Sequence, residues 1–328
     1  MKIAPAEPNL TYGIIVTLGA YLCFSIVAAI VRSFNPSFPT MEILFFQSLI
    51  SLIIVMPIFI KRKLYKVQKK LIPLHLVRSV SGVASFFCYF FAIKKMNLID
   101  ASVLTYTAPF YTPLIWLLWT KEKIEKGVWW TIILGFIGIA LILKPSNHLL
   151  KIGSFIGISA GVLASVALVS IKLLNQKMEC LTRTLFFYFL LSTLLTLPFA
   201  ILYWQTPNKI EILFLVSIGL VMALAQLFLT TAYKHGTAAF LSPISYSAII
   251  FTAFLSWIIF KQPPGYLTVI GAILIIIGGS ISYIIKIKPT KLIQIFEHSE
   301  EEKIHLWQTI RINHHHIEIH KHKKNNKP

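Results

Sequence analysis

The amino-acid sequence predicts an all-α polytopic membrane protein of ten transmembrane helices, built as two inverted repeats of five helices each. Two observations carry this prediction. Hydrophobic residues make up 56% of the 328 residues and charged residues only 13%, with a mean hydropathy of +0.74, whereas a soluble domain is typically about a quarter charged. The sequence also matches itself when it is shifted by 140 residues. Charge-free runs recur along the whole chain, which excludes a soluble enzyme with a single membrane anchor.

Ten predominantly apolar runs are long enough to cross a bilayer, whose core of about 30 Å needs roughly 20 apolar residues per helix. The segments between them are too short for a folded domain outside the membrane. The third run is the least typical, because His75 and Arg78 lie in its first turns. The predicted spans are 11–32, 43–60, 73–94, 100–119, 128–144, 153–174, 184–204, 211–233, 237–260 and 265–285.

Lysine and arginine residues are divided unequally between the two sides of the membrane. If both termini are cytoplasmic, 23 of the 31 fall on the inner side and 7 on the outer side, with Arg78 inside a span. Cytoplasmic loops carry such an excess. We therefore predict a multi-pass protein of the plasma membrane, the inner membrane in a bacterium, with both termini cytoplasmic. The net charge of +19 then reflects topology, and no nucleic-acid partner is expected.

The internal match extends to polar and proline residues, which chance similarity between apolar segments does not explain. Five helices per copy place the second copy upside down relative to the first. Inverted repeats are a common construction of secondary transporters, because two near-equivalent halves can exchange an inward-open for an outward-open state. Matched pairs are Asn35 with Asn175, Ser102 with Ser242, Tyr106 with Tyr246, Lys121 with Lys261 and, after a one-residue adjustment, Pro57 with Pro198.

Both copies carry an extended motif across their third to fifth helices. The first reads AIKKMNLIDASVLTYTAPFYTPL and then LGFIGIALILKP; the second reads AYKHGTAAFLSPISYSAIIFTAFLSWIIFKQPP and then VIGAILIIIGG. These segments resemble the EamA-type repeat of the drug/metabolite transporter superfamily, and within it the sequence is similar to the S-adenosylmethionine uptake transporters. The resemblance implies ten helices around a central cavity. The sequence departs from it at Gln47, where many members carry Arg, and at Lys121-Glu122 and Lys261-Gln262, where Gly-Glu is customary.

The chain accordingly divides into four parts. We expect a cytoplasmic N-terminus at residues 1–10, a first EamA-type repeat at 11–145, a second at 153–285 and a basic, histidine-rich cytoplasmic tail at 286–328. The tail holds seven of the ten histidines. Such a tail is interpreted as a solvated segment near anionic lipid or as a metal-binding tract. Because its histidines show no ordered ligand spacing, we predict neither a metal site nor a cofactor.

Arg78 is the most unusual residue within the predicted spans. A guanidinium there costs a few kcal/mol and usually binds a ligand or a partner. Its repeat counterpart is Ile218, and such an asymmetry is expected of a substrate contact. Two alternatives remain: Arg78 reaches the cytoplasmic headgroups from the first turns of its helix, or it forms a buried structural pair. Gln47 and Gln226 also need polar partners, supplied by a substrate or by a neighbouring helix.

The fourth and ninth predicted spans combine prolines with hydroxyl groups. Prolines free backbone carbonyls inside the membrane, and hydroxyls there either line a wet cavity or form bonds between helices. We expect Tyr106 and Tyr246 to face each other across the pseudo-twofold axis, with Arg78 near the cytoplasmic end of the cavity. Pro109, Pro113 and Pro243 are the predicted hinges or gates, and the predicted cavity residues are Arg78, Tyr106, Tyr246, Gln47, Thr105, Thr112, Gln226, Ser242 and Ser245.

Small and acidic residues have simpler interpretations. Glycines in the fifth and tenth spans permit close helix approach, so these helices are predicted to pack structurally or to form a homodimer face. Acidic residues at helix starts are predicted to be caps. The glycines are Gly135, Gly138, Gly271, Gly278 and Gly279, and the acids are Glu42, Asp100 and Glu211.

The function favoured by these features is secondary transport of a small polar or amphipathic metabolite, such as an amino acid, a nucleoside derivative like S-adenosylmethionine, or a carboxylate. The sequence contains no P-loop and no HExxH motif, and we predict that the protein is not an enzyme. An intramembrane enzyme acting on lipid is one alternative, but it needs a convergent carboxylate or histidine set. A non-transporting scaffold is the other, and the polar fourth and ninth helices disfavour it. The expected partners are a small molecule and the lipid bilayer.

Overall fold

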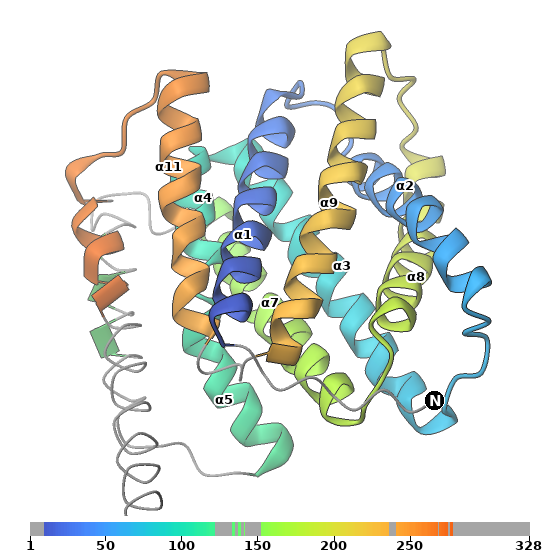
Figure 1. Ribbon diagram of the computed structural model, residues 1–328. Helices are drawn as coiled ribbons and strands as arrows, with labels where there is room; N and C mark the ends of the chain where they lie inside the picture. The colour runs from blue at the N-terminus through green and yellow to red at the C-terminus, as the bar shows by residue number, and fades with distance from the viewer. Residues whose placement is uncertain are drawn as a thin grey trace, which may run out of the picture. The chain divides into compact units, whose positions relative to one another are not determined.

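A computed structural model describes residues 10–121, 133–134, 137–138, 141, 152–235, 241–267, 269–274 and 276–277 (Figure 1). Within these ranges the regular elements are helices, without a strand, and six helices are long and apolar enough to cross a membrane. The helical membrane class is thereby confirmed. The elements are α1 (Leu10–Ser33), α2 (Thr40–Lys61), η1 (Lys69–Leu71), α3 (Ile72–Lys95), α4 (Leu98–Thr105), α5 (Ala108–Thr120), α7 (Ile152–Gln176), α8 (Leu181–Leu202), α9 (Lys209–His235), η2 (Ser242–Tyr246) and α11 (Ser247–Phe260).

Two predicted spans are not single α-helices. The span predicted at 100–119 consists of α4 and α5, separated at Tyr106 and Thr107. The physical reason is Pro109, which has no N–H to donate to the carbonyl of Thr105 and whose ring clashes with it. In the described part of the span predicted at 237–260, the 3₁₀ turn η2 precedes α11. Both spans are therefore interrupted beside a predicted hinge proline, Pro109 in the first and Pro243 in the second.

Several predictions fall outside the described residues. These are the N-terminus at residues 1–9, most of the span 128–144, about half of the span 265–285, and the histidine-rich tail 286–328. Of the glycines of the predicted homodimer face, only Gly138 and Gly271 belong to the described part of the chain. The homodimer stays a prediction.

The packing of the helices follows the repeat. In the 140-residue match, α1 corresponds to α7, α2 to α8 and α3 to α9. The largest contacts join α3 to α7 and, equivalently, α9 to α1, while α2 packs on its own counterpart α8. In Figure 1, α1 lies beside α9 and α11, and α2 lies beside α8. Each half is thus packed mainly against the other half, as expected for inverted repeats whose interface holds a site.

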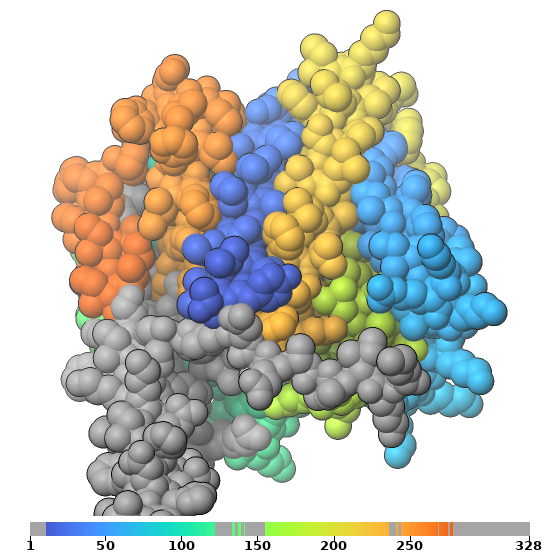
Figure 2. Space-filling model, viewed as in Figure 1, coloured from blue at the N-terminus to red at the C-terminus, as the bar shows by residue number. Residues whose placement is uncertain are grey.

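Large apolar side chains cover the outside of these helices. Figure 2 shows one face of the bundle, formed by α11, α1, α9 and α2. The exposed residues of these helices include Ile15 of α1, Ile53 of α2 and Leu213 of α9, at 61%, 59% and 63% of their full accessibility. An apolar surface of this extent marks contact with lipid.

The acidic residues at helix starts differ in what they do. Glu211 is a cap: its carboxylate accepts a hydrogen bond from the backbone N–H of Asn208 at 2.8 Å, and the Asn208 side chain accepts from the N–H of Glu211 at 2.9 Å. Glu42 instead reaches across to the α8–α9 loop, where it accepts from the N–H of Gln205 at 3.0 Å. Glu42 therefore connects the two repeats rather than capping its own helix.

Candidate functional site

The break between α4 and α5 is stabilised by hydroxyl groups. Thr107 donates its side-chain hydrogen to the carbonyl of Leu104 at 2.6 Å. The carbonyl of Ala108 accepts from Thr112 Oγ1 at 2.9 Å and from Ser165 Oγ of α7 at 2.7 Å. Ser165 thus fastens a helix of the second repeat to the broken helix of the first.

An equivalent arrangement exists in the other half. The carbonyl of Ala248, at the start of α11, accepts from Thr252 Oγ1 at 2.7 Å and from Ser25 Oγ of α1 at 3.3 Å. Ala248, Thr252 and Ser25 are the repeat counterparts of Ala108, Thr112 and Ser165. This arrangement, in which a serine of one repeat bonds to a carbonyl of the other, is called a serine joint below. It occurs twice, and the Ser25 bond of the second joint is longer than the Ser165 bond of the first.

Gly161 lets α7 lie directly against the α4–α5 break. A Cβ atom at this position would lie 2.7 Å from Thr107 Oγ1 and 3.0 Å from the carbonyl oxygens of Leu104 and Thr105. Backbone atoms cannot yield to such a contact as a flexible side chain can. A glycine is therefore needed for this approach.

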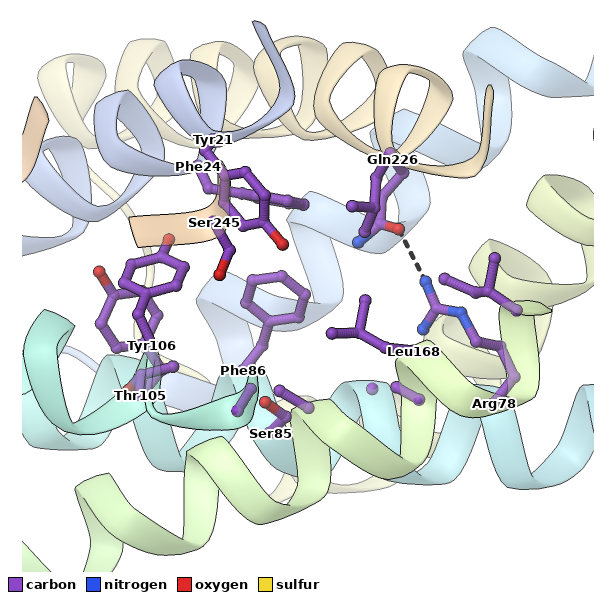
Figure 3. A pocket seen from close by; sticks show the side chains of 17 residues that line it. Tyr21, Phe24, Arg78, Ser85, Phe86, Thr105, Tyr106, Leu168, Gln226 and Ser245 are labelled. Atoms are coloured by element: carbon purple, nitrogen blue, oxygen red, sulfur yellow. Dashed lines mark hydrogen bonds between the residues drawn. The ribbon is translucent and has the colours of Figure 1, made fainter. Parts of the chain in front are cut away.

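A cavity of about 80 Å³ lies beside the break, lined by residues of both repeats (Figure 3). Arg78 of α3 and Gln226 of α9 form one end, and Thr105, Tyr106 and Ser245 lie toward the other. Phe86 and Leu168 lie between the two ends in this view. The cavity consequently has a charged end, an apolar middle and a hydroxyl-bearing end.

Arg78 is buried inside the protein, with 3% of its surface exposed. Its Nη2 donates to Gln226 Oε1 at 2.7 Å, and its guanidinium carbon lies 4.0 Å from the centre of the Tyr188 ring. In this structure the side chain points into the bundle, toward Gln226, rather than toward headgroups. It also contacts both repeats, since Gln226 and Tyr188 belong to the second.

Aromatic rings surround the middle of the cavity. Tyr106 packs edge-on against Tyr21 and Tyr89, with ring centres 5.7 and 6.1 Å apart, and Phe24 lies 5.8 Å from Phe86. The hydroxyl groups of Tyr89 and Ser102 form a hydrogen bond of 2.7 Å. These contacts hold the rings in place, so the apolar middle is a shaped surface.

Five of the predicted cavity residues line the cavity: Arg78, Thr105, Tyr106, Gln226 and Ser245. Three do not. Gln47 is buried in α2, Thr112 bonds to its own helix, and Tyr246 packs with its ring centre 6.0 Å from that of Phe110. For Ser242 and Pro243 only the backbone, in η2, belongs to the described structure. Of the other predicted hinges, Pro109 opens α5 and Pro113 lies inside it.

The structure therefore departs from the expectation that Tyr106 and Tyr246 face each other across one cavity. The reason is local geometry. Tyr246 is the last residue of the 3₁₀ turn η2, whereas Tyr106 follows the last residue of the α-helix α4, so the backbone differs between the two counterparts. The position that its counterpart Tyr106 occupies in the cavity is consequently not reproduced in the second half.

Several lining residues were not among the sequence candidates, notably Tyr21, Phe24, Phe86 and Tyr89. Aromatic residues in apolar helices look alike whether they face lipid, core or cavity. One signal was available: Tyr21 stands where the second repeat has Gly161, a large mismatch between otherwise similar helices.

A charged cluster joins the repeats at the end that carries the 61–70 loop. Glu179 Oε1 accepts from Arg183 Nη1 at 2.6 Å, and Glu179 Oε2 lies 3.9 Å from His75 Nε2 of α3. Arg183 Nε donates to the carbonyl of Leu64, in the α2–α3 loop, at 3.3 Å. Glu42, with its bond to Gln205, lies in a comparable place at the opposite end of the bundle. Polar contacts thus close the interface between the repeats at both ends.

The helices are apolar and long enough to cross a membrane, and a cavity lies beside a broken helix at the interface of two inverted halves. These features define the class of α-helical membrane transporters. Within this class, the chain belongs to the EamA-like transporter family, whose model matches residues 11–144 and again residues 151–284. The double match agrees with the internal repeat.

Curated relatives are transporters rather than enzymes. The chain is 30% identical over 269 residues to the pseudopaline exporter CntI of Pseudomonas aeruginosa PAO1, covering 81% of this chain and 94% of that protein. It is 24% identical over 242 residues to the S-adenosylmethionine uptake transporter of Rickettsia conorii, covering 72% and 80%. A solved structure titled "Crystal structure of protein" matches with a TM-score of 0.65 at 17% identity, covering 84% of this chain and 98% of that one.

Proposed function

We propose that the protein is a secondary transporter that moves a small polar or amphipathic metabolite across the plasma membrane by alternating access. An amino acid, a nucleoside derivative such as S-adenosylmethionine, and a carboxylate are the candidate substrates. The observation that carries the proposal is the cavity between the two repeats, next to the α4–α5 break. Discontinuous helices at a repeat interface are where secondary transporters bind their substrates.

The contacts at the two ends of the interface support alternating access. Opening the cavity toward the 61–70 loop requires the Glu179 cluster to separate, while the Glu42–Gln205 contact holds the opposite end closed. Opening toward the other side requires the reverse. Two closures, one at each end of a single cavity, are what an alternating mechanism needs.

The names of the relatives bear on the substrate in different ways. One relative is named as an exporter of pseudopaline, and another as an uptake transporter of S-adenosylmethionine. Export and import are thus both represented among proteins similar to this one. We extend to this chain only their common feature, a small organic metabolite as substrate.

Orientation and boundaries are part of the proposal. The excess of lysine and arginine supports cytoplasmic termini, with the 61–70 loop inside the cell. We place the two transport repeats at residues 11–145 and 153–285, flanked by a short N-terminus and the basic tail 286–328. Arg78 then lies toward the cytoplasmic end of the cavity.

Uptake into liposomes that contain the purified protein tests this function. We expect saturable, protein-dependent uptake of at least one compound from a panel of amino acids, nucleoside derivatives and carboxylates. Ala164 lines the cavity at the position equivalent to Phe24, so Ala164→Phe should block uptake by filling the cavity. Val162→Phe is the matched control, because Val162 is 37% exposed on the same helix. Uptake that is unchanged in Ala164→Phe would show that substrate does not pass through this cavity.

A further inference from the structure

We propose that the cavity selects anions: its substrate is an amphipathic carboxylate whose charged end takes the place of Gln226 on the Arg78 guanidinium. The apolar body of this substrate lies among Phe24 and Phe86. This inference rests on the proposed transport function and names the class of its substrate.

The first step is that Arg78 lacks a counter-charge. The two ion pairs in the described part of the chain join Glu179 to Arg183 and to His75, and neither includes Arg78. Among the described residues that line the cavity, none is Asp or Glu. A guanidinium stays protonated in proteins, and a buried charge without a partner is strongly unfavourable. The site is therefore electrostatically incomplete without an anion.

The second step concerns Gln226, which acts as a resident substitute for that anion. Its Oε1 accepts from Arg78 Nη2 at 2.7 Å, the contact that a carboxylate oxygen makes in a charge-assisted bond. Its Nε2 has only a weak acceptor, Met222 Sδ, at 3.8 Å. The amide is consequently held loosely at its other end. It can turn so that its NH₂ group donates to an incoming carboxylate beside Arg78.

The third step is that the guanidinium has donors to spare and is held in position. Arg78 Nε has no hydrogen-bond partner. The space beside Nη1 exists because residue 82 is glycine: a Cβ there would lie 2.5 Å from Nη1 and 2.9 Å from Tyr188 Cε2. Gly82 and the Tyr188 ring thus set the plane of the guanidinium. A fixed, planar fork is suited to a carboxylate, which has two oxygens to bind.

The fourth step is the shape of the remaining cavity. Away from Arg78 it is bounded by rings, with Phe24 and Phe86 5.8 Å apart. At the far end, Thr105 Oγ1 is buried and has no hydrogen-bond partner. An apolar middle and a free hydroxyl fit a molecule with a carboxylate at one end, an apolar body and a hydrogen-bonding group at the other. A ligand whose charged end is an amine finds no opposite charge among these residues.

Binding to the purified full chain tests the inference without relying on transport. The probes are three molecules of nearly equal shape: 3-phenylpropionate, 3-phenylpropanamide and 3-phenylpropylamine. Calorimetry and thermal unfolding should show that the carboxylate binds at least about tenfold more tightly than the other two, a difference of about 1.4 kcal/mol. Equal binding of the three probes, tighter binding of the amine, or no binding of the carboxylate would each overturn the proposal.

The variant Gln226→Glu gives the sharpest result. It is almost isosteric and supplies Arg78 with a carboxylate from the protein itself. We expect a protein at least as heat-stable as the wild type that has lost its preference for 3-phenylpropionate. Gln68→Glu, which adds the same charge at an exposed position, should retain that preference. A Gln226→Glu protein that folds and still binds the carboxylate normally would show that Arg78 is not the anion site.

The two proposals fail in different ways. If the carboxylate binds as expected but liposomes take up no compound, the transport function is wrong and the anion site remains. If uptake is found but Gln226→Glu transports its substrate as well as the wild type does, transport stands and the anion site is wrong.

Discussion

The two halves of the molecule are alike where the helices are joined and unlike where the cavity is lined. The joints are repeated almost atom for atom. Ser165 bonds to the carbonyl of Ala108, and Ser25 bonds to that of Ala248. The helices after both joints end in a lysine with left-handed backbone, Lys121 at φ 60° and Lys261 at φ 55°. Few non-glycine residues adopt this conformation, so its recurrence reflects shared architecture.

The cavity shows the opposite behaviour. Several of its lining residues are replaced, at equivalent positions, by residues of different chemistry, although Thr105 and its counterpart Ser245 keep a hydroxyl in both halves. A charged residue, two aromatic rings and two glycines of the first or second half each have a repeat counterpart of a different kind in the other half. The pairs are Arg78 with Ile218, Phe86 with Gln226, Tyr89 with Leu229, Gly82 with Met222 and Gly161 with Tyr21. Given the proposed function, we infer from this comparison that the shared residues serve the movement of the halves, whereas the divergent ones serve recognition of the substrate.

The comparison depends first on the halves being inverted, and labelling of introduced cysteines gives an all-or-none answer. Asn147, outside the described residues, belongs to the segment predicted to connect the repeats, and Lys66 lies in the α2–α3 loop. In a protein whose three native cysteines are replaced, Asn147→Cys should react only with reagent added outside the cell. Lys66→Cys should react only from the cytoplasm. Labelling of both positions from the same side would end the inverted-repeat interpretation.

Removing the charge of Arg78, one of the cavity residues that differ between the halves, should have the largest effect on transport. If Arg78 binds the substrate carboxylate as proposed, Arg78→Ala removes two or more charge-assisted hydrogen bonds, worth about 1.5–3 kcal/mol each, so uptake at low substrate concentration should fall by roughly 100-fold or more. Arg78→Lys should fall between this variant and the wild type, because lysine keeps the charge but not the planar fork. Initial uptake rates in liposomes measure both.

Two controls separate recognition from structure in that experiment. Ile218→Val changes the equivalent position of the other half, and Lys95→Ala removes a charge at the end of α3, away from the cavity. Both should transport nearly as the wild type does. An Arg78→Lys protein with normal rates would instead mean that any cation suffices at this position, and the specific role of the guanidinium would be wrong.

The sequence predicts the shared helices better than it predicts the residues that line the cavity. The helices could be predicted, because the membrane requires long apolar runs. Arg78 and Gln226 could be found, because polar groups stand out against such runs. Phe24 and Phe86 could not, because an aromatic ring in an apolar helix carries no sign of whether it faces lipid or a cavity. Tyr246 was expected in the cavity because it is the repeat counterpart of Tyr106, and the repeat alone does not indicate the 3₁₀ turn in which it lies.

An intermediate effect is expected at the closest approach of the two halves. Gly161→Ala places a methyl group 3.0 Å from two backbone carbonyls, and overpacking of this kind costs typically about 1–3 kcal/mol. We expect lower thermal stability and a roughly tenfold slower uptake, because α7 must move away from the α4–α5 break. The matched control is Gly19→Ala, whose new atom meets only the Phe228 side chain, at 3.1 Å. Equal effects of the two variants would show that this approach has no special role.

The smallest effects are expected at the two serine joints, and they test the symmetry most finely. Hydrogen bonds between membrane helices average about 0.6 kcal/mol, so Ser165→Ala should lower the free energy of unfolding by about that amount. Ser25→Ala should lower it less, because its bond to Ala248 is 3.3 Å long against 2.7 Å for Ser165 to Ala108. Ser159→Ala, which removes a hydroxyl bonded only within α7, is the control and should change little.

The unequal lengths of the Ser165 and Ser25 hydrogen bonds have a consequence for the alternating mechanism. If the two halves exchange roles during the transport cycle, the Ser165 bond becomes the long one and the Ser25 bond becomes the short one. Ser165→Ala should then favour the state in which the Ser25 bond is the short one, and Ser25→Ala should favour the present state. Labelling of Ala167→Cys, which lies in the cavity, from each side of the membrane would report the shift. Shifts in the same direction would mean that the joints are static supports, and the link between shared residues and movement would be lost.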